Sequence, residues 1–552
     1  MYLYTYENLL EKAKTEKGKD YIEKIRKCYE ENYENKPITT LTFSKFKLFH
    51  LNGNRSEYER EYFDRRKRFM LLQVLALVDD KYLEALEDII AAICDEITWC
   101  LPAHCLVRDK LTYNYEAIDL FASETALYLS ETAYILKDRL SNEIKHRIEY
   151  SLKNRIVNVF ETQEQSFERM GNNWLSVCAC GIGTAYLYSF PERFDIVKDR
   201  IFGAMHKYIN NLDPDGYCSE GLTYWVYGFG FFALFYDVYT QLTGEWPEIL
   251  DSSTVKNSLK YAKNAVFGDN LFLTIADGGM YDMLWERTNV VIVDRLFNAD
   301  VTINGEIRLP DRDVLGLRRL YCIDLREKES EFEKEDCYFE NSQVLIKRKE
   351  NYIFVSKGGN NGEMHNHNDI GAFSIFRNGK PYILDLGAGE YTNDYFGSAV
   401  KRYSKEIFVC SAYSHSIPVI DDTMQTWGKE YYATVLDRTD DYIVYDISKA
   451  YPLDVEDFTV KYSFLDNEVK ALYNASNIKN NVTFRFVSIV EPKLENDKVY
   501  IDDMLITNSH SLSPVVEKVN YKNHAGEFVS AYVIDYKLNE KAVVEFNFSF
   551  QN

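Results

Sequence analysis

The spacing of apolar residues changes once along this chain, and that change limits the folds that the chain can adopt. Up to about residue 300, apolar side chains recur at steps of three and four, which is the spacing of amphipathic helices. One such run is Leu83, Leu86, Ile90 and Ile93. After a charge-rich stretch between Arg308 and Glu340 the spacing becomes two, which is typical of β-strands. We therefore predict an α+β protein with two domains, a helical domain over residues 1–310 and an antiparallel β-sandwich over residues 311–552.

Helix pairs are the expected unit of the first domain. A helix predicted over Ile118–Leu136 lies between the runs at 83–93 and 144–159. Stacked helix pairs form either an open solenoid or a closed α/α toroid, and the spacing of apolar residues does not distinguish the two. The sequence has no repeat of fixed length, which disfavours a tetratricopeptide or HEAT array.

The second domain has a strong hairpin signal at Asn378-Gly379, because this pair accepts the positive φ angles of a type I′ turn. Alternating apolar residues flank the pair on both sides. Further strands are expected at Tyr352–Ser356, Tyr442–Ile447, Val482–Val490 and Val543–Phe550. Many short strands with few helices imply a β-sandwich of some size.

Composition narrows the class of partner. The 552 residues carry a formal charge of −22, which disfavours nucleic acid and anionic membranes as partners. Aromatic residues make up 15% of the chain, with 43 tyrosines, and such side chains either stack on sugar rings or fill cores. The start, Met1–Glu7, runs into alternating Glu and Lys with no apolar signal segment, so we expect a cytoplasmic protein. The ten cysteines are then expected to be free thiols.

Three of the nine histidines fall in one strand-like stretch, residues 362–425. His365 and His367 stand at i and i+2, and on an extended segment such residues point to the same face. Asp385 and His415 follow in the same stretch. Two imidazoles and one carboxylate are ligands that zinc accepts, with a fourth position left for water, so the residues alone predict a metal centre here.

The helical half holds polar clusters that are unusual for packed helices. Asn172-Asn173-Trp174 opens a helix of small residues. One asparagine is a good N-cap, whereas a second amide near a helix N-terminus suits an anion such as a carboxylate.

A second cluster follows the turn at Asp213–Tyr217 and contains Glu220, Tyr224 and Trp225. An earlier loop, broken by proline, carries Trp99 and His104. The aromatic side chains of these segments either line a cleft or pack inside the protein, and the sequence leaves both readings open.

In this order and on these two architectures, the motifs resemble those of the heparinase II/III-like polysaccharide lyases over most of the chain. The resemblance rests on Asn172-Asn173-Trp174, Asp215-Gly216, Glu220-Gly221, Tyr224-Trp225, His365–Asp369, Leu384–Gly387, His415 and Gln425. It implies an N-terminal α/α toroid, which is an incomplete α/α barrel, followed by a C-terminal antiparallel β-sandwich. It also implies a carbon–oxygen lyase that cleaves uronic-acid-containing glycans by β-elimination without an organic cofactor.

The implied reaction explains the residue types. Elimination removes the weakly acidic C5 proton of a uronate, so hydrogen bonds that neutralise the adjacent carboxylate stabilise the enolate-like intermediate. By resemblance, Asn173 has this role, Tyr224 gives a proton to the leaving O4, and His365 is a second acid or base. Tyr224 can also act as the base if nearby positive charge lowers its pKa. The residues expected to bind substrate are Asn172, Trp99, His104, Glu220, Trp225 and Arg402.

The resemblance also divides the histidine cluster. His367, Asp385 and His415 fall on positions that hold a zinc-like metal in some members of the family, while His365 faces the substrate. The implied Zn²⁺ is structural and fixes the loop that presents His365. The alternative is that both metal-site histidines are hydrogen-bonded core residues and that Asp385 only forms a turn.

The substrate stays open at several points. Trp174 stands where some uronate lyases of this type carry a histidine, which leaves the uronate epimer and syn or anti elimination undecided. Acidic oligosaccharides of the glycosaminoglycan type are the expected substrate, and alginate-type oligouronates are an alternative. Two other functions remain, a glycoside hydrolase that pairs Asp213 or Glu220 with Asp277, and a non-catalytic carbohydrate-binding protein. A homo-oligomer is compatible with the sequence.

Overall fold

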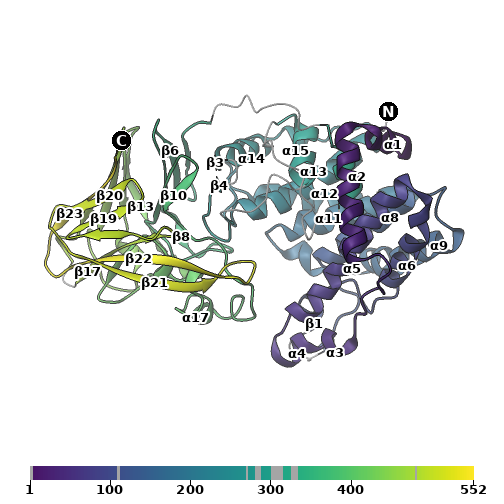
Figure 1. Cartoon of the computed structure of the whole chain (residues 1–552), viewed down its shortest axis with the longest axis horizontal. Helices are drawn as coiled ribbons and strands as arrows, with labels where there is room; N and C mark the ends of the chain where they lie inside the picture. Colours follow the sequence, from purple (N-terminus) through teal and green to yellow (C-terminus); the bar gives the residue numbers. More distant parts are fainter. Residues whose placement is uncertain are drawn as a thin grey trace. The chain divides into compact units, whose positions relative to one another are not determined.

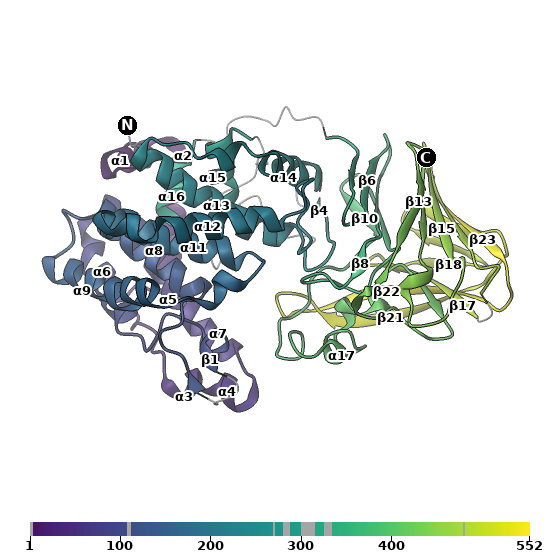
Figure 2. The same cartoon turned by 180° about the vertical axis from the view of Figure 1, so that it is seen from behind.

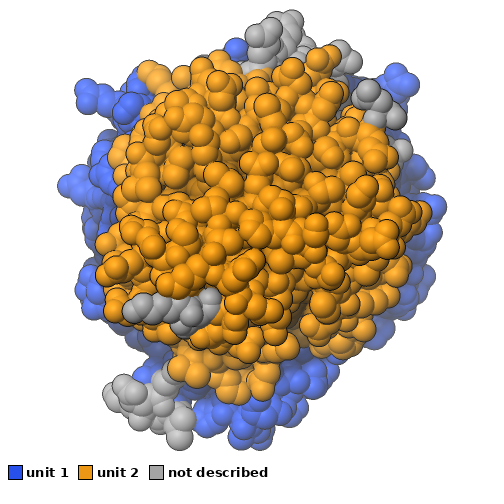
Figure 3. All heavy atoms as spheres, turned by 90° about the vertical axis from the view of Figure 1, so that its left-hand side faces the viewer, with its two compact units in different colours: residues 1–211, 225–255, 283–332 blue, residues 212–224, 256–282, 333–552 orange. Residues whose placement is uncertain are grey.

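The computed structural model describes residues 4–107, 112–268, 271–279, 288–299, 315–324, 334–478 and 481–551. The chain forms two compact units, which Figure 3 colours separately. Unit 1 comprises residues 1–211, 225–255 and 283–332, and unit 2 comprises residues 212–224, 256–282 and 333–552. The domain boundary predicted at residue 310 lies outside the described residues.

Unit 1 is helical, as predicted, and Figures 1 and 2 show its helices. The chain enters unit 2 at residue 212 and returns to unit 1 within α13, because residues 222–224 belong to unit 2. It enters unit 2 again within α14, after residue 255. Strands β1 (Leu106–Val107) and β2 (Thr112–Tyr113) form a small hairpin. The helices before residue 330 are α1 (Tyr6–Lys14), α2 (Glu16–Asn32), α3 (Phe43–Phe46), α4 (Leu48–Asn52), α5 (Ser56–Val78), α6 (Leu83–Cys94), α7 (Pro102–Cys105), α8 (Leu120–Ile135), α9 (Asn142–Leu152), α10 (Asn158–Thr162), α11 (Trp174–Ser189), α12 (Phe194–Asn211), α13 (Leu222–Thr243), α14 (Ser253–Asn264), α15 (Thr288–Phe297) and α16 (Gly316–Tyr321).

Helices α8 and α11 pack closely because α11 is rich in small residues. A Cβ added at Gly181 of α11 would lie 2.2 Å from the carbonyl oxygen of Ser123 on α8, so only glycine allows this approach. Both helices are buried over most of their length. Helix α11 is therefore small or apolar on every side, whereas α8 also buries polar side chains such as Glu131.

A buried ion-pair network connects four helices of unit 1. Arg318 of α16 lies 2.6 Å from Glu131 of α8 and 3.4 Å from Asp237 of α13. Asp237 also lies 2.9 Å from Arg295 of α15. Charges taken out of water require such partners, so these pairs fix which helices are neighbours.

Unit 2 is built mainly from antiparallel sheets, as predicted. Its three larger sheets have the strand orders β10-β9-β7-β6-β5, β11-β17-β22-β21 and β13-β14-β15-β16-β23-β20-β19-β18, and β12 pairs with β8. The strands are β3 (Val266–Gly268), β4 (Leu271–Phe272), β5 (Cys337–Phe339), β6 (Val344–Arg348), β7 (Ile353–Lys357), β8 (Asn360–Asn361), β9 (Phe373–Arg377), β10 (Lys380–Ile383), β11 (Pro418–Ile420), β12 (Gly428–Tyr432), β13 (Thr434–Arg438), β14 (Tyr442–Asp446), β15 (Thr459–Leu465), β16 (Glu468–Asn474), β17 (Val482–Ser488), β18 (Lys493–Glu495), β19 (Lys498–Ile501), β20 (Met504–Asn508), β21 (Pro514–Lys522), β22 (Phe528–Leu538) and β23 (Val543–Phe550).

Aromatic side chains fill the core of unit 2. Strands β15 and β16 alternate buried and partly exposed residues, so one face of their sheet is covered. The covered side chains include Tyr462 and Phe548, whose ring centroids lie 5.1 Å and 5.2 Å from that of Phe373 on β9. The hydroxyl of Tyr462 donates to the carbonyl of Gly371 at 2.7 Å. Much of the aromatic bias of the sequence is therefore core packing.

Local predictions hold in several places. The hairpin at Asn378-Gly379 joins β9 and β10, and both residues have positive φ angles, of 49° and 69°. The four further predicted strands are observed as β7, β14, β17 and β23. The helix expected over 144–159 is interrupted by a π-helical turn at Lys153–Val157. All ten cysteines are free thiols, and no helix among the described residues is both long and apolar enough to cross a bilayer.

A close contact between two turns of unit 2 positions the site described below. Gly387 has a φ angle of 67°, and a Cβ added there would lie 2.0 Å from the carbonyl oxygen of Gly278. The turn after β10, which contains Asp385, therefore touches the segment after β4, which contains Asp277. Only glycine satisfies both the backbone angle and the contact.

We predict that Gly387→Ala lowers the free energy of unfolding by about 2–4 kcal/mol, because the new methyl group displaces the Gly278 backbone. Urea denaturation measures the loss. Gly379→Ala is the matched control, since Gly379 has a φ angle of 69° with no atom near its added Cβ, and it should cost only about 1–2 kcal/mol. Equal losses for the two variants would contradict a specific contact at Gly387.

Candidate functional site

The buried carboxylate of Asp277 is the centre of the candidate site in unit 2. Asp277 follows the short strand β4, and its side chain has no exposed surface. Its Oδ2 lies 2.6 Å from His365 Nδ1, and its Oδ1 lies 3.1 Å from His367 Nε2. The two histidines of the His-x-His motif therefore reach one centre, as expected, but that centre is a carboxylate.

Two tyrosines and an arginine complete the surroundings of Asp277. Tyr391 donates to Oδ2 at 3.1 Å, and Tyr395 donates to Oδ1. The Arg402 guanidinium, on helix α17 (Ala399–Arg402), lies 3.5 Å from Oδ2. Burial alone would raise the pKa of Asp277, but the hydrogen bonds from both histidines and the charge of Arg402 hold it well below its usual range. Asp277 is therefore an anion that only accepts hydrogen bonds.

This anion fixes the protons of its neighbours. Tyr391 uses its one proton on Asp277, so the hydroxyl of Tyr224, 2.8 Å from that of Tyr391, must be the donor between the two tyrosines. His365 likewise donates from Nδ1 to Asp277, which leaves the lone pair on Nε2. Burial and the negative charge of Asp277 raise the pKa of Tyr224 well above its usual value. Tyr224 is thus a proton donor at neutral pH.

The donor and the acceptor lie side by side. The rings of Tyr224 and His365 have their centroids 4.2 Å apart. His365 has a φ angle of 54°, in the left-handed region that a side chain other than glycine rarely adopts. Its side chain remains 14% exposed, so a ligand can reach the imidazole. Backbone strain of this kind concentrates at functional sites.

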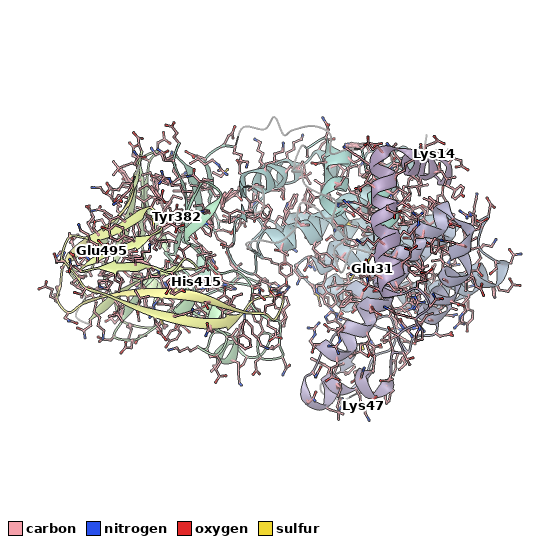
Figure 4. The ribbon with its side chains drawn as sticks, in the orientation of Figure 1. Lys14, Glu31, Lys47, Tyr382, His415 and Glu495 are labelled. Carbon is pink, nitrogen blue, oxygen red and sulfur yellow. The ribbon has the colours of Figure 1, made fainter. Side chains whose placement is uncertain are left out.

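The expected metal ligands also come together in unit 2. One ligand atom each from His367, Asp385 and His415 lies within 4.8 Å of the others, and all three residues are buried. His415 Nδ1 is 3.2 Å from Asp385 Oδ2, and His367 Nδ1 is 3.9 Å from Asp385 Oδ1. Figure 4 labels His415.

The hydrogen bonds of both histidines indicate that a cation belongs between them. His415 Nε2 lies 3.1 Å from the carbonyl oxygen of Val409, which can only accept, so the lone pair of His415 is on Nδ1. His367 gives its Nε2 proton to Asp277, which leaves its own Nδ1 facing Asp385. Neither Nδ1 has a hydrogen-bond partner among the described residues. Two lone pairs and a carboxylate repel one another unless a proton or a metal ion lies between them.

The alternative to a metal is an additional proton on His367. Burial disfavours the charged imidazole, but interactions with Cys410, Asp277 and Asp385 outweigh it and raise the pKa of His367 to about 10. The donor set, two imidazole nitrogens and one carboxylate, suits Zn²⁺. These residues therefore fit the expected zinc ion.

Unit 1 brings together a second group of the expected residues. Asn172 Oδ1 accepts the backbone N–H of Trp174 at 3.2 Å, so Asn172 has the capping role at α11. The side chain of Asn173 makes no capping hydrogen bond. His104 packs against Trp174 with ring centroids 4.9 Å apart, and its Nδ1 lies 2.8 Å from the buried Asp119.

Two of the residues predicted to bind substrate are fully buried. Trp99 is 1% exposed and donates from Nε1 to the carbonyl of Ile93 at 2.9 Å, so its loop folds onto its own indole. Trp225 is 0% exposed and stacks on Phe229. Both indoles fill the core of unit 1.

Glu220 and Arg402, two further residues predicted to bind substrate, both lie in buried or partly buried surroundings. Glu220 is buried, and that burial raises the pKa of its carboxyl. Arg402 faces Asp277 and also lies over the ring of Tyr395, at 4.8 Å from the centroid. Its charge is therefore used to balance the buried anion.

The sequence reading missed the role of Asp277 and the two tyrosines that bind it. The sequence suggested Asp277 only as one of the two carboxylates of a glycoside hydrolase, and it gave no reason to select Tyr391 or Tyr395. The available signal was an acidic residue next to Gly278-Gly279 directly after an apolar run. The partners of Asp277 are 88 to 125 residues away in sequence.

Comparison with known proteins supports the fold. No protein-family model and no curated protein matches the sequence. Solved structures do match, although the identities are low. A heparan sulfate lyase HepC mutant from Pedobacter heparinus is 15% identical, with 90% of this chain and 77% of that chain covered and a TM-score of 0.59. A heparinase III gene product is 13% identical, with 98% and 91% covered and a TM-score of 0.60.

A chondroitin AC lyase from Streptomyces coelicolor A3, solved in complex with chondroitin sulphate, is 12% identical. The match covers 99% of this chain and 82% of that chain, with a TM-score of 0.58. The chain therefore has the fold of the heparinase and chondroitin lyase structures, an α/α toroid followed by an antiparallel β-sandwich, as the motifs predict.

Proposed function

We propose that the protein is a polysaccharide or oligosaccharide lyase that cleaves uronic-acid-containing glycans, of the glycosaminoglycan type, by β-elimination. The observation that carries the proposal is the pair formed by Tyr224 and His365. Because Asp277 accepts hydrogen bonds from Tyr391 and His365, Tyr224 carries a proton and His365 Nε2 carries a lone pair. The ring centroids of Tyr224 and His365 are 4.2 Å apart. A paired acid and base is what the elimination requires.

In the proposed reaction, His365 Nε2 takes the C5 proton and Tyr224 gives its proton to the leaving O4. The C5–H and C4–O4 bonds break, the C4=C5 double bond forms, and the product carries a 4,5-unsaturated uronate end. Tyr391 accepts a hydrogen bond from Tyr224 in the resting protein and orients its hydroxyl. Each positioned proton transfer typically contributes about 10²–10⁴-fold to the rate.

Asn173 is the proposed partner of the substrate carboxylate. Its amide is at the N-terminus of α11 and is not used for capping, so it can donate to an anion where the helix dipole also favours negative charge. Neutralising the carboxylate stabilises the enolate-like intermediate, and such electrostatic stabilisation is often the largest contribution to the rate.

The short distance between the two rings favours syn elimination. An acid and a base on neighbouring rings reach the sugar from one side, which suits a uronate whose C5 proton and O4 are cis, such as glucuronate. In iduronate these groups are trans, and their elimination needs an acid and a base on opposite faces. We therefore propose glucuronate-type linkages as the substrate.

The glycoside hydrolase alternative needs Asp277 as one of its two catalytic carboxylates, and the surroundings of Asp277 disfavour that role. Asp277 is fully buried and receives hydrogen bonds from four side chains, so it is not available as a nucleophile or a base for water. A carbohydrate-binding protein without turnover would have no use for the proton arrangement around Tyr224 and His365.

The test is the ultraviolet absorbance of the unsaturated product on a panel of oligosaccharides. The panel contains chondroitin and heparosan for glucuronate, dermatan for iduronate, and alginate oligomers. We expect product from the glucuronate substrates and much less from dermatan. No activity on any uronate would refute the lyase, and equal rates on both epimers would refute syn elimination only.

Variants then assign the roles. Tyr224→Phe and His365→Ala should each lower kcat by about 10²–10⁴-fold while circular dichroism stays unchanged. Tyr442→Phe and His510→Ala are matched controls, because Tyr442 binds Asp437 on a sandwich strand and His510 is an exposed turn residue. Full activity of either test variant would contradict the assignment.

The pH profile distinguishes Tyr224 as acid from Tyr224 as base. Its raised pKa keeps the hydroxyl protonated as the pH rises, so the acid should not be lost and kcat should stay level between about pH 7 and 9. A tyrosine base would instead become more active with each unit of pH. A steady rise of kcat through this range would assign the base role to Tyr224.

We also propose that His367, Asp385 and His415 hold one structural Zn²⁺ ion, which supplies positive charge between their ligand atoms. Mass spectrometry of the purified protein should find about one zinc per chain. His415→Gln and chelation should each remove the metal and lower the melting temperature by several degrees. Protein that is metal-free yet equally stable and active would refute the site.

A further inference from the structure

The loop that carries His365 and His367 lies above a buried lysine that the mechanism does not use. Lys357 is the last residue of β7, and its side chain is 4% exposed. Its ammonium donates to Asn366 Oδ1 at 2.7 Å and to Asp369 Oδ1 at 2.6 Å. We infer that Lys357 is a positioning residue that holds this loop in the geometry that His365 needs. Only the expected effect on kcat rests on the lyase proposal, and the effect on the loop does not.

Lys357 is a rigid anchor because its backbone is fixed as well. Its N–H donates to the carbonyl of Ala372 at 3.0 Å, and its carbonyl accepts from Gly371 N–H at 2.7 Å. The strand β7 also pairs with β6 and β9 on its two sides. The ammonium therefore projects from a fixed strand end into the loop that joins β8 to β9.

The first partner of Lys357 stands between the two histidines. The Asn366 amide nitrogen donates to the carbonyl of His367, and its backbone carbonyl accepts from the hydroxyl of Tyr403 at 3.1 Å. With Lys357 on its side-chain oxygen, Asn366 is held at three points. Its neighbour His365 has the left-handed φ angle of 54°, which an unsupported loop would not keep.

The second partner closes the other end of the loop. Asp369 is 1% exposed and pairs with Lys357 as a buried ion pair. Its carbonyl accepts from the N–H of Ala372 at 2.9 Å. A buried pair that loses one member leaves an uncompensated charge, so both charges are expected to be needed together.

One ammonium thus binds the loop at residues 366 and 369, within four residues of both histidines. The distance of 2.6 Å between His365 Nδ1 and Asp277 Oδ2 leaves little room for movement. If the loop shifts, His365 loses the hydrogen bond that fixes its tautomer and its orientation toward Tyr224. Misplacement of a catalytic group by about 1 Å costs about 100-fold in rate.

The experiment compares Lys357→Met with Lys347→Met. Lys347 is on the neighbouring strand β6 and pairs with Asp336 at 2.5 Å, so the control also removes an ion-paired lysine of the same sheet. Hydrogen–deuterium exchange measures the loop over residues 361–370, with residues 459–474 of β15 and β16 as an internal reference. Steady-state kinetics on the best substrate gives kcat and KM separately.

For Lys357→Met we expect faster exchange in the loop alone, and kcat lowered by about 100-fold with KM within about threefold. Lys357→Arg should restore part of kcat, since it keeps the charge. Lys347→Met should change neither the loop nor kcat. Unchanged loop exchange and a kcat within twofold of the wild type would overturn the inference.

Two further outcomes are distinguished by design. If Lys357→Met does not fold, Asn366→Ala removes one partner without leaving a buried charge unpaired, and the same two readouts decide. If the wild-type protein cleaves no uronate, the lyase proposal fails, and loop exchange in Lys357→Met alone decides whether the lysine holds the loop.

Discussion

The candidate site depends on one buried charge. Asp277 has no exposed surface, so its anion is stable only because donors from several segments surround it. The loop after β8 supplies His365 and His367, and the segment after β10 supplies Tyr391 and Tyr395. Each of these segments is irregular and would otherwise have many conformations. The shared anion selects the one in which their side chains converge.

His367 connects this anion to the candidate metal ligands Asp385 and His415. Its Nε2 binds Asp277, and its Nδ1 faces Asp385 beside His415. The position of the proton on this one imidazole therefore affects both carboxylates, Asp277 and Asp385. A cation at the cluster favours the tautomer with the proton on Nε2, which in turn donates to Asp277. The zinc proposal and the acid–base proposal are thus coupled through one ring, that of His367.

The sequence predicts the fold well because apolar spacing is a local property. Periods of 3.6 and 2 identify helices and strands, and Asn378-Gly379 identifies a turn from two residues. The site is harder to predict from the sequence, because the hydrogen-bond partners of Asp277 are 88 or more residues away from it along the chain. Resemblance to known lyases singled out Tyr224 and His365, which lie side by side around Asp277, but it also singled out Trp225, which is buried in the core. An aromatic residue in a motif does not reveal which way its ring points.

The sequence predicts that His365 and His367 reach one centre because they lie on a strand. The structure brings both to Asp277, but by a turn. On a regular strand, residues at i and i+2 share a face and would approach one ligand from the same side. Here His365 has a φ angle of 54°, so the segment is not extended, and the two rings bind different oxygens of Asp277. The turn exposes His365 while His367 stays buried. A loop held by the buried Lys357 therefore leaves one imidazole of a short motif accessible and keeps the other buried.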